Sequence, residues 1–231
     1  ALEPQEILNI ERLLECTEAT RKSLKAVVQE APATAEVGRR LPEVGVLLSA
    51  LKGKIASNGE VEDHASPLLK RIRNEINILR NRLYQTLGKI LERHSASHVI
   101  QDEVITLRNE RFVIPVRVEK RKELGGVVHG TSSSGATLFL EPLETLELNN
   151  ELVRLKERAE EEVQRILRSL TTGIRERLED LRLAVETLGY LDFSFAKARF
   201  SREFHCVIPE VNDEGLLAIA DGRHPTLERT L

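Results

Sequence analysis

The sequence contains no tryptophan and no methionine, and only 3% of its 231 residues are aromatic. Leu, Ile and Val must therefore supply most of the packing in any core. No apolar run approaches the roughly 20 residues that a membrane-spanning helix needs, and no signal peptide is visible. We therefore expect a cytoplasmic protein. The absence of Met, in a chain that begins with Ala1, favours a fragment of something longer.

Cysteine is also scarce. The two residues, Cys16 and Cys206, lie far apart in the sequence, and neither belongs to a C-x-x-C pair. Both stand beside apolar residues, a setting that favours reduced and mostly buried thiols, as is usual in the cytoplasm.

Positive charge is not in excess. The chain has 34 basic and 37 acidic side chains and a formal net charge of −3, so bulk charge does not make it a nucleic-acid-binding protein. Such binding would require a local basic patch. With 41% hydrophobic and 31% charged residues, the composition favours a helix-rich, elongated protein.

Two long stretches carry the apolar repeat of an α-helix. The first starts at Ser66 and Pro67, a cap followed by proline at the first helical position, and runs to about residue 98. Its apolar residues recur at alternating three- and four-residue steps, the pattern of a coiled coil. The second runs from beyond Pro142 to Leu188, and Gly173 interrupts its stripe as a candidate for a bend. Because neither stretch is apolar all round, we expect them to pack on each other, antiparallel.

The segment between these helices has the residues of short β-strands. The candidates are residues 104–107, 112–114, 116–118, 126–129 and 137–140. Residues 108–111 read as a hairpin turn, and Pro115 predicts that its strand is at an edge or bulged. Phe112 and Phe139 are both expected in the core rather than as platforms for stacking bases.

The flanking segments are less regular. Residues 4–31 read as a helix, residues 32–60 as one or two short helices and turns, and residues 205–208 and 216–219 as strand-like pieces.

The predicted fold is therefore mainly α, a long antiparallel coiled-coil lever with a small β-sheet clamp inserted at its tip. Residues 1–101 form a helical core and the outgoing helix, and residues 102–143 form the clamp. Residues 144–200 form the returning helix, and residues 201–231 form a connection onward.

A glycine- and serine-rich stretch, residues 130–137, has the G-x-x-x-x-G spacing of a phosphate-binding loop and the Thr two places later. Ala136 stands where the phosphate-binding Lys is needed, and the residues that follow do not start a helix. ATP binding is therefore not expected. The stretch is either a flexible hairpin turn or a loop whose hydroxyls and N–H groups contact a sugar-phosphate backbone.

The strongest local charge lies in the same insert, where six cations fall within fifteen residues, offset by Glu110, Glu119 and Glu123. Such a cluster is either ordinary solvated charge or a patch for salt-sensitive, sequence-independent binding of phosphates. The candidate nucleic-acid-binding residues are Arg108, Arg111, Arg117, Lys120, Arg121, Lys122, His129, Ser132, Ser133 and Ser134.

No set of residues indicates catalysis. His94 and His98 are four apart on a helix, but no third metal ligand accompanies them. No Ser-His-Asp or Cys-His combination can be argued, and the abundant carboxylates are explained by ion pairs along helix faces. We therefore predict no catalytic residue, no metal site and no cofactor in this chain.

Five stretches, residues 59–73, 111–117, 126–142, 147–150 and 221–227, resemble in the same order the second bacterial branch of the MutS family, which lacks mismatch-reading domains. The resemblance implies a core, lever and clamp. It also implies an ATPase, with ATP and Mg²⁺, beyond Leu231 and a Smr-type endonuclease further on, so that the full-length protein is a homodimeric enzyme and this chain is not.

The family's roles give two expectations for the partner. One is branched or double-stranded DNA during the control of homologous recombination, and the other is the rRNA of collided ribosomes that the protein splits. Nothing in this chain could insert an aromatic ring into a mismatch. The alternative is a structural arm whose tip contacts a protein or its twin in the dimer.

Overall fold

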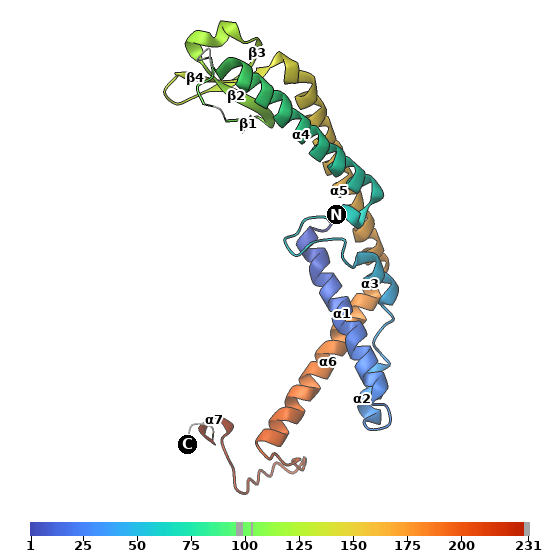
Figure 1. Ribbon diagram of the computed structural model, residues 1–231. Coiled ribbons are helices and arrows are strands. Elements are labelled where there is room, and N and C mark those ends of the chain that lie inside the picture. The colour runs from blue at the N-terminus through green and yellow to red at the C-terminus, as the bar shows by residue number, and fades with distance from the viewer. Residues whose placement is uncertain (96–98, 103, 229–231) are drawn as a thin grey trace. The chain divides into compact units, whose positions relative to one another are not determined.

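The computed structural model describes residues 1–95, 99–102 and 104–228 (Figure 1). The chain forms two compact units. The first unit consists of Ala1–Glu11 and Ser49–Glu176, and the second of Arg12–Leu48 and Arg177–Leu231. Helix α1 (Pro4–Ala26) contributes to both. The four-part division expected from the sequence stays a prediction.

The first unit is built on two long helices, α4 (Pro67–Ser95) and α5 (Leu146–Glu176). They run antiparallel, because the start of α4 is bonded to the middle of α5 while Arg93, near its end, bonds to Glu144 just before α5. Apolar residues of both helices share one core, namely Ile72, Ile76, Leu79, Leu83, Leu87, Leu152 and Leu155. The antiparallel packing of the two helices is confirmed, and their supercoiling stays a prediction.

Helix α4 begins with a serine cap followed by proline, as the sequence predicted. Ser66 Oγ accepts hydrogen bonds from the backbone N–H groups of Leu68 and Leu69, at 3.1 and 3.2 Å. A serine cap satisfies donors that have no partner inside the helix. The predicted start at Ser66 and Pro67 is confirmed.

The returning helix is not continuous, and the prediction of a single helix to Leu188 is wrong. Helix α5 passes through Gly173 and ends at Glu176, and α6 (Leu178–Glu203) follows it. The break is at Arg177, whose backbone leaves the helical region (φ −114°, ψ 24°). Its guanidinium bonds to Asp180 and, at 2.8 Å, to the carbonyl of Glu43. These contacts, rather than a glycine, accompany the break.

The insert is a four-stranded antiparallel sheet at the end of the helix pair where α4 ends and α5 begins (Figure 1). Its strands are β1 (Thr106–Arg108), β2 (Arg111–Arg117), β3 (Gly126–Thr131) and β4 (Thr137–Pro142), in the order β1-β2-β4-β3. A 3-10 segment, η2 (Val118–Glu123), joins β2 to β3. The inner face of the sheet contributes Phe112, Ile114, Val116 and Leu140 to the core, and the expectation for Phe112 is confirmed.

Two expectations for the strands have different outcomes. The hairpin turn is confirmed, since Arg108 pairs with Arg111 and both residues between them have positive φ angles. The edge position expected for Pro115 is wrong, because β2 lies between β1 and β4. The proline is tolerated because β1 pairs with β2 only as far as Val113. After Val113, the only pairing on that side of β2 among the described residues is an isolated bridge between Ile100 and Val116. The missing N–H of Pro115 therefore interrupts no continuous ladder of hydrogen bonds there.

The remaining elements are short. They are α2 (Pro32–Gly38), α3 (Gly45–Leu51), η1 (Asp63–Ala65), η3 (Leu143–Thr145) and α7 (Pro225–Glu228). The second unit has a small core of Leu24, Leu41 and Leu191. Among the residues described, no helix combines the length and apolarity that crossing a membrane requires.

The C-terminal segment and the thiols both depart from expectation. Residues 205–208 and 216–219 form no strand, and Ile208 is 95% exposed. A strand needs a neighbour to pair its backbone, and these pieces have none within the described chain. Cys16 and Cys206 are free, but both are exposed, so their expected burial is wrong.

Candidate nucleic-acid interface

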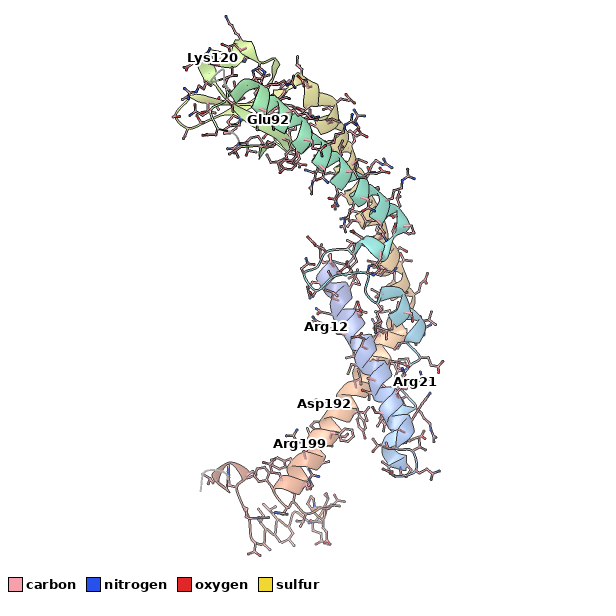
Figure 2. All side chains as sticks on the ribbon, viewed as in Figure 1. Arg12, Arg21, Glu92, Lys120, Asp192 and Arg199 are labelled. Carbon is pink, nitrogen blue, oxygen red and sulfur yellow. The ribbon has the colours of Figure 1, made fainter. Side chains whose placement is uncertain are left out.

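The two parts of the predicted interface, the basic segment and the serine-rich turn, lie next to each other in the first unit. Arg117, at the end of β2, pairs with Thr137 at the start of β4. The next residue, Val118, begins η2 and donates its N–H to the carbonyl of Ala136 at 3.2 Å. Strand pairing therefore brings the start of η2 beside the β3–β4 turn. Figure 2 marks Lys120 at this end of the unit.

The cations of η2 differ in whether an acidic side chain already pairs with them. Arg121 and Lys122 are exposed, and within the described residues neither makes a hydrogen bond or ion pair. Lys120 Nζ lies 2.6 Å from Glu123 Oε1, in a pair whose side chains are 39% and 45% exposed. A pair so exposed is easily exchanged for another anion. The segment can therefore offer two free cations and a third in competition with Glu123.

The serine-rich turn is a closed hairpin rather than a phosphate-binding loop. Gly135 donates to the carbonyl of Ser132 at 2.9 Å and adopts a positive φ of 73°. Thr137 N–H donates to Ser132 Oγ at 3.1 Å, which leaves Ser133 and Ser134 exposed at the tip. The turn leads into β4, so no helix N-terminus is present there to hold phosphates. It offers hydroxyls on a short, fixed loop.

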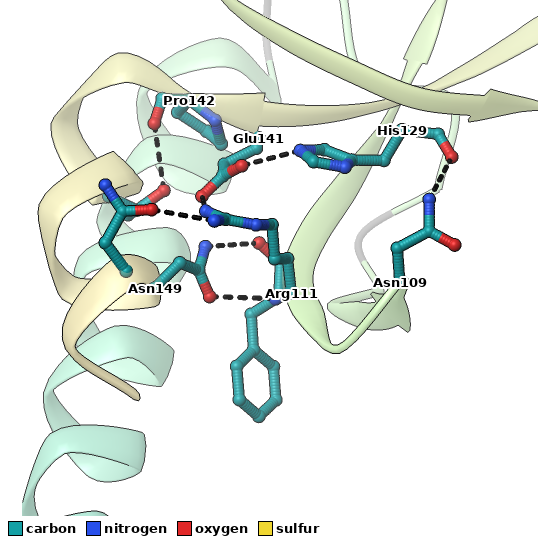
Figure 3. A network of polar contacts seen from close by, with 9 residues as sticks. Asn109, Arg111, His129, Glu141, Pro142 and Asn149 are labelled. Atoms are coloured by element: carbon teal, nitrogen blue, oxygen red, sulfur yellow. Dashed lines mark hydrogen bonds and ion pairs between the residues drawn. The ribbon is translucent and has the colours of Figure 1, made fainter. Parts of the chain in front are cut away.

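Two of the predicted residues, Arg111 and His129, are directed at a buried carboxylate (Figure 3). Glu141 is only 1% exposed, and its oxygens lie 2.9 Å from Arg111 Nη1 and 2.6 Å from His129 Nε2. Because a carboxylate only accepts hydrogen bonds, Nε2 carries the hydrogen. A buried charge needs such partners. Arg111 and His129 therefore satisfy Glu141 and are not free for a phosphate.

The same network ties the sheet to α5 (Figure 3). Asn149, fully buried, accepts from Phe112 N–H at 3.0 Å and donates to Phe112 C=O at 3.1 Å. Asn150 Oδ1 accepts from Arg111 Nη2 at 2.7 Å. Sequence reasoning missed this network. The signal was two consecutive asparagines inside an apolar helical stripe, where residues of low helix propensity need a reason to be present.

The remaining candidates are Arg108, which contacts an aromatic ring, and Arg117, which pairs with Thr137. The guanidinium carbon of exposed Arg108 lies 4.3 Å from the centre of the Phe139 ring. Arg117 is half-buried, and its Nε is buried without a hydrogen-bond partner among the described residues. Phe139 was expected in the core, but it is only partly buried and its ring contacts a cation.

The structure thus places η2, the serine-rich turn, Arg108 and Arg117 at one end of the first unit and directs Arg111 and His129 inward. That any of these residues binds nucleic acid stays a prediction. His98, one of the histidine pair noted in the sequence, lies outside the described residues.

No family model matches the sequence. It is similar to curated proteins named "Endonuclease MutS2" or "Putative endonuclease MutS2". It is 37% identical to the protein of Bacillus velezensis and 38% identical to that of Bacillus subtilis, over 98% of this chain and 29% of each relative. It is 42% identical to the protein of Acetivibrio thermocellus, over 76% of this chain and 22% of the relative. The chain therefore spans less than a third of the length of these relatives.

Proposed function

Because this chain belongs to the MutS2 family, we propose that it is the lever and clamp region of a MutS-like ATPase and that its sheet grips the backbone of DNA or rRNA without reading sequence. The observation that carries the proposal is the position of the unpaired cations Arg121 and Lys122 beside the hydroxyl-rich turn. Contacts from cations and hydroxyls to phosphate position a protein on nucleic acid but carry no sequence information.

The polar network couples the sheet to the helix pair, so that the two can move together. Asn149 and Asn150 at the start of α5 hold β2 through Phe112 and Arg111. A sheet held in this way moves with the helices as one body, so a displacement of the lever would open or close the grip. In the full-length homodimer we place the source of that displacement in an ATPase domain, which needs ATP and Mg²⁺.

We also propose that the full-length protein acts in the control of recombination through branched DNA or in the rescue of collided ribosomes. The relatives are named endonucleases, and we assign any nuclease activity to parts of the full-length protein other than the residues described here. Among the described residues, no group of three or more His, Cys, Asp or Glu side chains is placed to hold a metal ion.

The test is a binding titration of the 231-residue chain with labelled four-way-junction DNA, and separately with ribosomes, at 50 and 200 mM salt. If two or three phosphates are neutralised, affinity for the DNA should fall by about ten- to fortyfold over that fourfold rise in salt. The triple variant Lys120→Glu, Arg121→Glu, Lys122→Glu should lose most of the binding at low salt.

A matched control separates local charge from net charge. Lys70, Arg158 and Arg168 are exposed cations on α4 and α5. Their triple replacement by Glu changes the net charge by the same six units, from −3 to −9. It should bind more strongly than the η2 triple variant. Equal losses in both triples, or no binding by the wild-type chain, would rule out the assignment.

The alternative is an arm that contacts a protein. It is favoured by exposed apolar side chains on the sheet and at the start of η2, since Leu107 is 49%, Val127 42% and Val118 43% exposed. In that case the chain would not be retained on nucleic acid at low salt. Function in the full-length protein would then be lost on Leu107→Ser and Val127→Ser and kept in the η2 triple variant.

A further inference from the structure

Phe139 lies on the face of the sheet that points away from the helix pair. Its neighbour in β4, Leu140, is fully buried in the core shared with α4 and α5. Because side chains alternate along a strand, the Phe139 ring is directed to the opposite face. We call this the outer face. It carries Arg108, Arg111, Val113, Pro115, Arg117, Phe139 and Glu141, which the strand register places on the same side.

On the outer face, Arg108 lies over the Phe139 ring. It is exposed, at the end of a three-residue edge strand. Among the described residues its guanidinium makes no hydrogen bond or ion pair. Val113 lies in the row between Arg108 and Phe139 and is fully buried. A contact between a cation and a ring on an exposed surface is weak, so a ligand that stacks on Phe139 can displace Arg108.

The charge on this face is positive. Its acidic residue, Glu141, is buried and already paired with Arg111 and His129. Arg117 contributes a guanidinium whose Nε has no partner among the described residues. A buried donor without an acceptor is uncommon in a folded protein, and here it lies on the strand next to that of Phe139. The face thus combines the Phe139 ring with two arginines that are not paired with Glu141, namely Arg108 and Arg117, and the Nε of Arg117 is the unsatisfied donor.

We propose that the outer face binds an unpaired base of single-stranded nucleic acid, with the base stacked on Phe139 beneath a displaced Arg108 and the adjoining phosphate at Arg117. This inference rests on the proposed function and specifies its ligand. Stacking on an aromatic residue within a cationic groove is how proteins hold single strands without reading sequence. A paired base within a duplex has both faces covered, so the ligand is a single strand or the open part of a junction.

The absence of tryptophan from the chain makes the test direct. Phe139→Trp introduces one fluorophore at the site. Titration with short oligodeoxythymidylate should quench its emission, and a blunt duplex of the same length at the same salt should not. No change in emission with either ligand, while binding is detected by anisotropy, would overturn the inference.

Affinity variants supply the second readout. Phe139→Leu and Arg108→Ala should each weaken single-strand binding by about tenfold, within the range for loss of one stacked base. Phe139→Tyr keeps a ring and should bind as the wild type. The matched control is Phe193→Leu, because Phe193 on α6 is also exposed and lies 4.5 Å from the ammonium of Lys197. It should not change binding.

The outcomes separate this inference from the proposed function. If Phe139→Leu and Arg108→Ala, folded as judged by circular dichroism, bind single strands as tightly as the wild type while the η2 triple variant does not, the stacking site is wrong and the cationic grip remains. If the wild-type chain binds neither single strands, nor branched DNA, nor ribosomes, both fail. If Phe139→Leu weakens single-strand binding and Phe139→Tyr does not, the stacking site is supported.

Discussion

Ser66 Oγ donates a hydrogen bond of 2.5 Å to Glu162 Oε1, across 96 residues of sequence. The same hydroxyl accepts from the N–H groups of Leu68 and Leu69 at the start of α4. Both side chains are nearly inaccessible, at 4% and 5% exposure. One oxygen therefore caps α4 and fixes its first turn against α5, which sets the register of the two helices at the end far from the sheet.

Replacing Ser66 should destabilise the first unit. Ser66→Ala removes a helix cap, worth about 1 kcal/mol, and leaves the buried Glu162 short of one donor, which costs about a further 1–3 kcal/mol. We expect a loss of about 2–4 kcal/mol in the free energy of unfolding, measured in urea by circular dichroism. The control is Thr172→Ala, because that exposed hydroxyl bonds only within its own helix. It should cost under about 0.5 kcal/mol. Equal effects of the two changes would show that Ser66 is an ordinary surface hydroxyl.

Glu162 predicts how stability responds to acid. The pKa of Glu162 is lowered to about 2, chiefly by the hydrogen bond from Arg165 and against the opposing effect of burial, with smaller contributions from the Ser66 hydroxyl and the charge of Arg165. A depressed pKa in the folded state means that the ionised form stabilises the fold. Its contribution is complete above the ordinary value of 4.5 and is lost as the pH falls through about 2.

The variant Glu162→Gln resembles the protonated side chain and isolates this contribution. Its melting temperature should lie below that of the wild type at pH 7, and the two values should converge as the pH falls from about 4.5 to about 2. A difference that stays constant over this range would show that Glu162 acts through its shape and not its charge.

Local rules predicted the parts of the fold that depend on neighbouring residues. The cap at Ser66 and the hairpin at residues 108–111 need only the backbone preferences of a few residues, and both are confirmed. The break at Arg177 could not be predicted in this way, because it involves the carbonyl of Glu43, 134 residues away in sequence. The apolar pieces after residue 204 look like strands in the sequence, but a strand also needs a partner.

The features of the candidate site likewise differ in whether the local sequence could predict them. The cluster of cations was visible in the sequence, and Arg121 and Lys122 are exposed as a loop charge should be. The inward direction of Arg111 could not be predicted, because nothing local indicates that Glu141 is buried. Alternation along a strand also does not say which face meets the core, so Phe112 and Phe139 looked equivalent.

Arg111 should matter more for folding than for binding. Arg111→Met leaves the buried Glu141 with His129 alone and removes the bond to Asn150. Breaking one side of a buried ion pair costs about 3–5 kcal/mol, and partial exposure of Arg111 places the expected loss near the lower figure. The control is Arg154→Met, because its pair with Glu147 is 65% and 79% exposed and should cost under about 1 kcal/mol.

A second substitution distinguishes charge from packing in this network. In the double variant Arg111→Met, Glu141→Gln no buried charge remains unpaired, so part of the lost stability should return. Additive losses in urea unfolding would mean that Arg111 and Glu141 contribute independently, contrary to the network that the contacts describe.

Two glycines of the first unit should respond to alanine with opposite signs. Gly126 pairs with Pro142 at the junction of β3 and β4, and an added Cβ would lie 2.3 Å from the carbonyl oxygen of Glu141 and 2.9 Å from the side chain of Leu140. Neither neighbour can yield, since one is backbone and the other is fully buried. Gly126→Ala should therefore force the strands apart and cost about 1–3 kcal/mol, as overpacking does.

Gly88 provides the opposite case, because it lies within α4 and an added Cβ would meet nothing within 4 Å. Alanine there reduces the freedom of the unfolded chain, so Gly88→Ala should raise the free energy of unfolding by about 0.4–1 kcal/mol. Both changes add the same single methyl group, so a difference in sign between their urea midpoints reports the space at each site. Loss of stability at Gly88, or tolerance at Gly126, would contradict the packing of α4 or of the β3–β4 pair, and with it the position of the sheet on which the proposed grip depends.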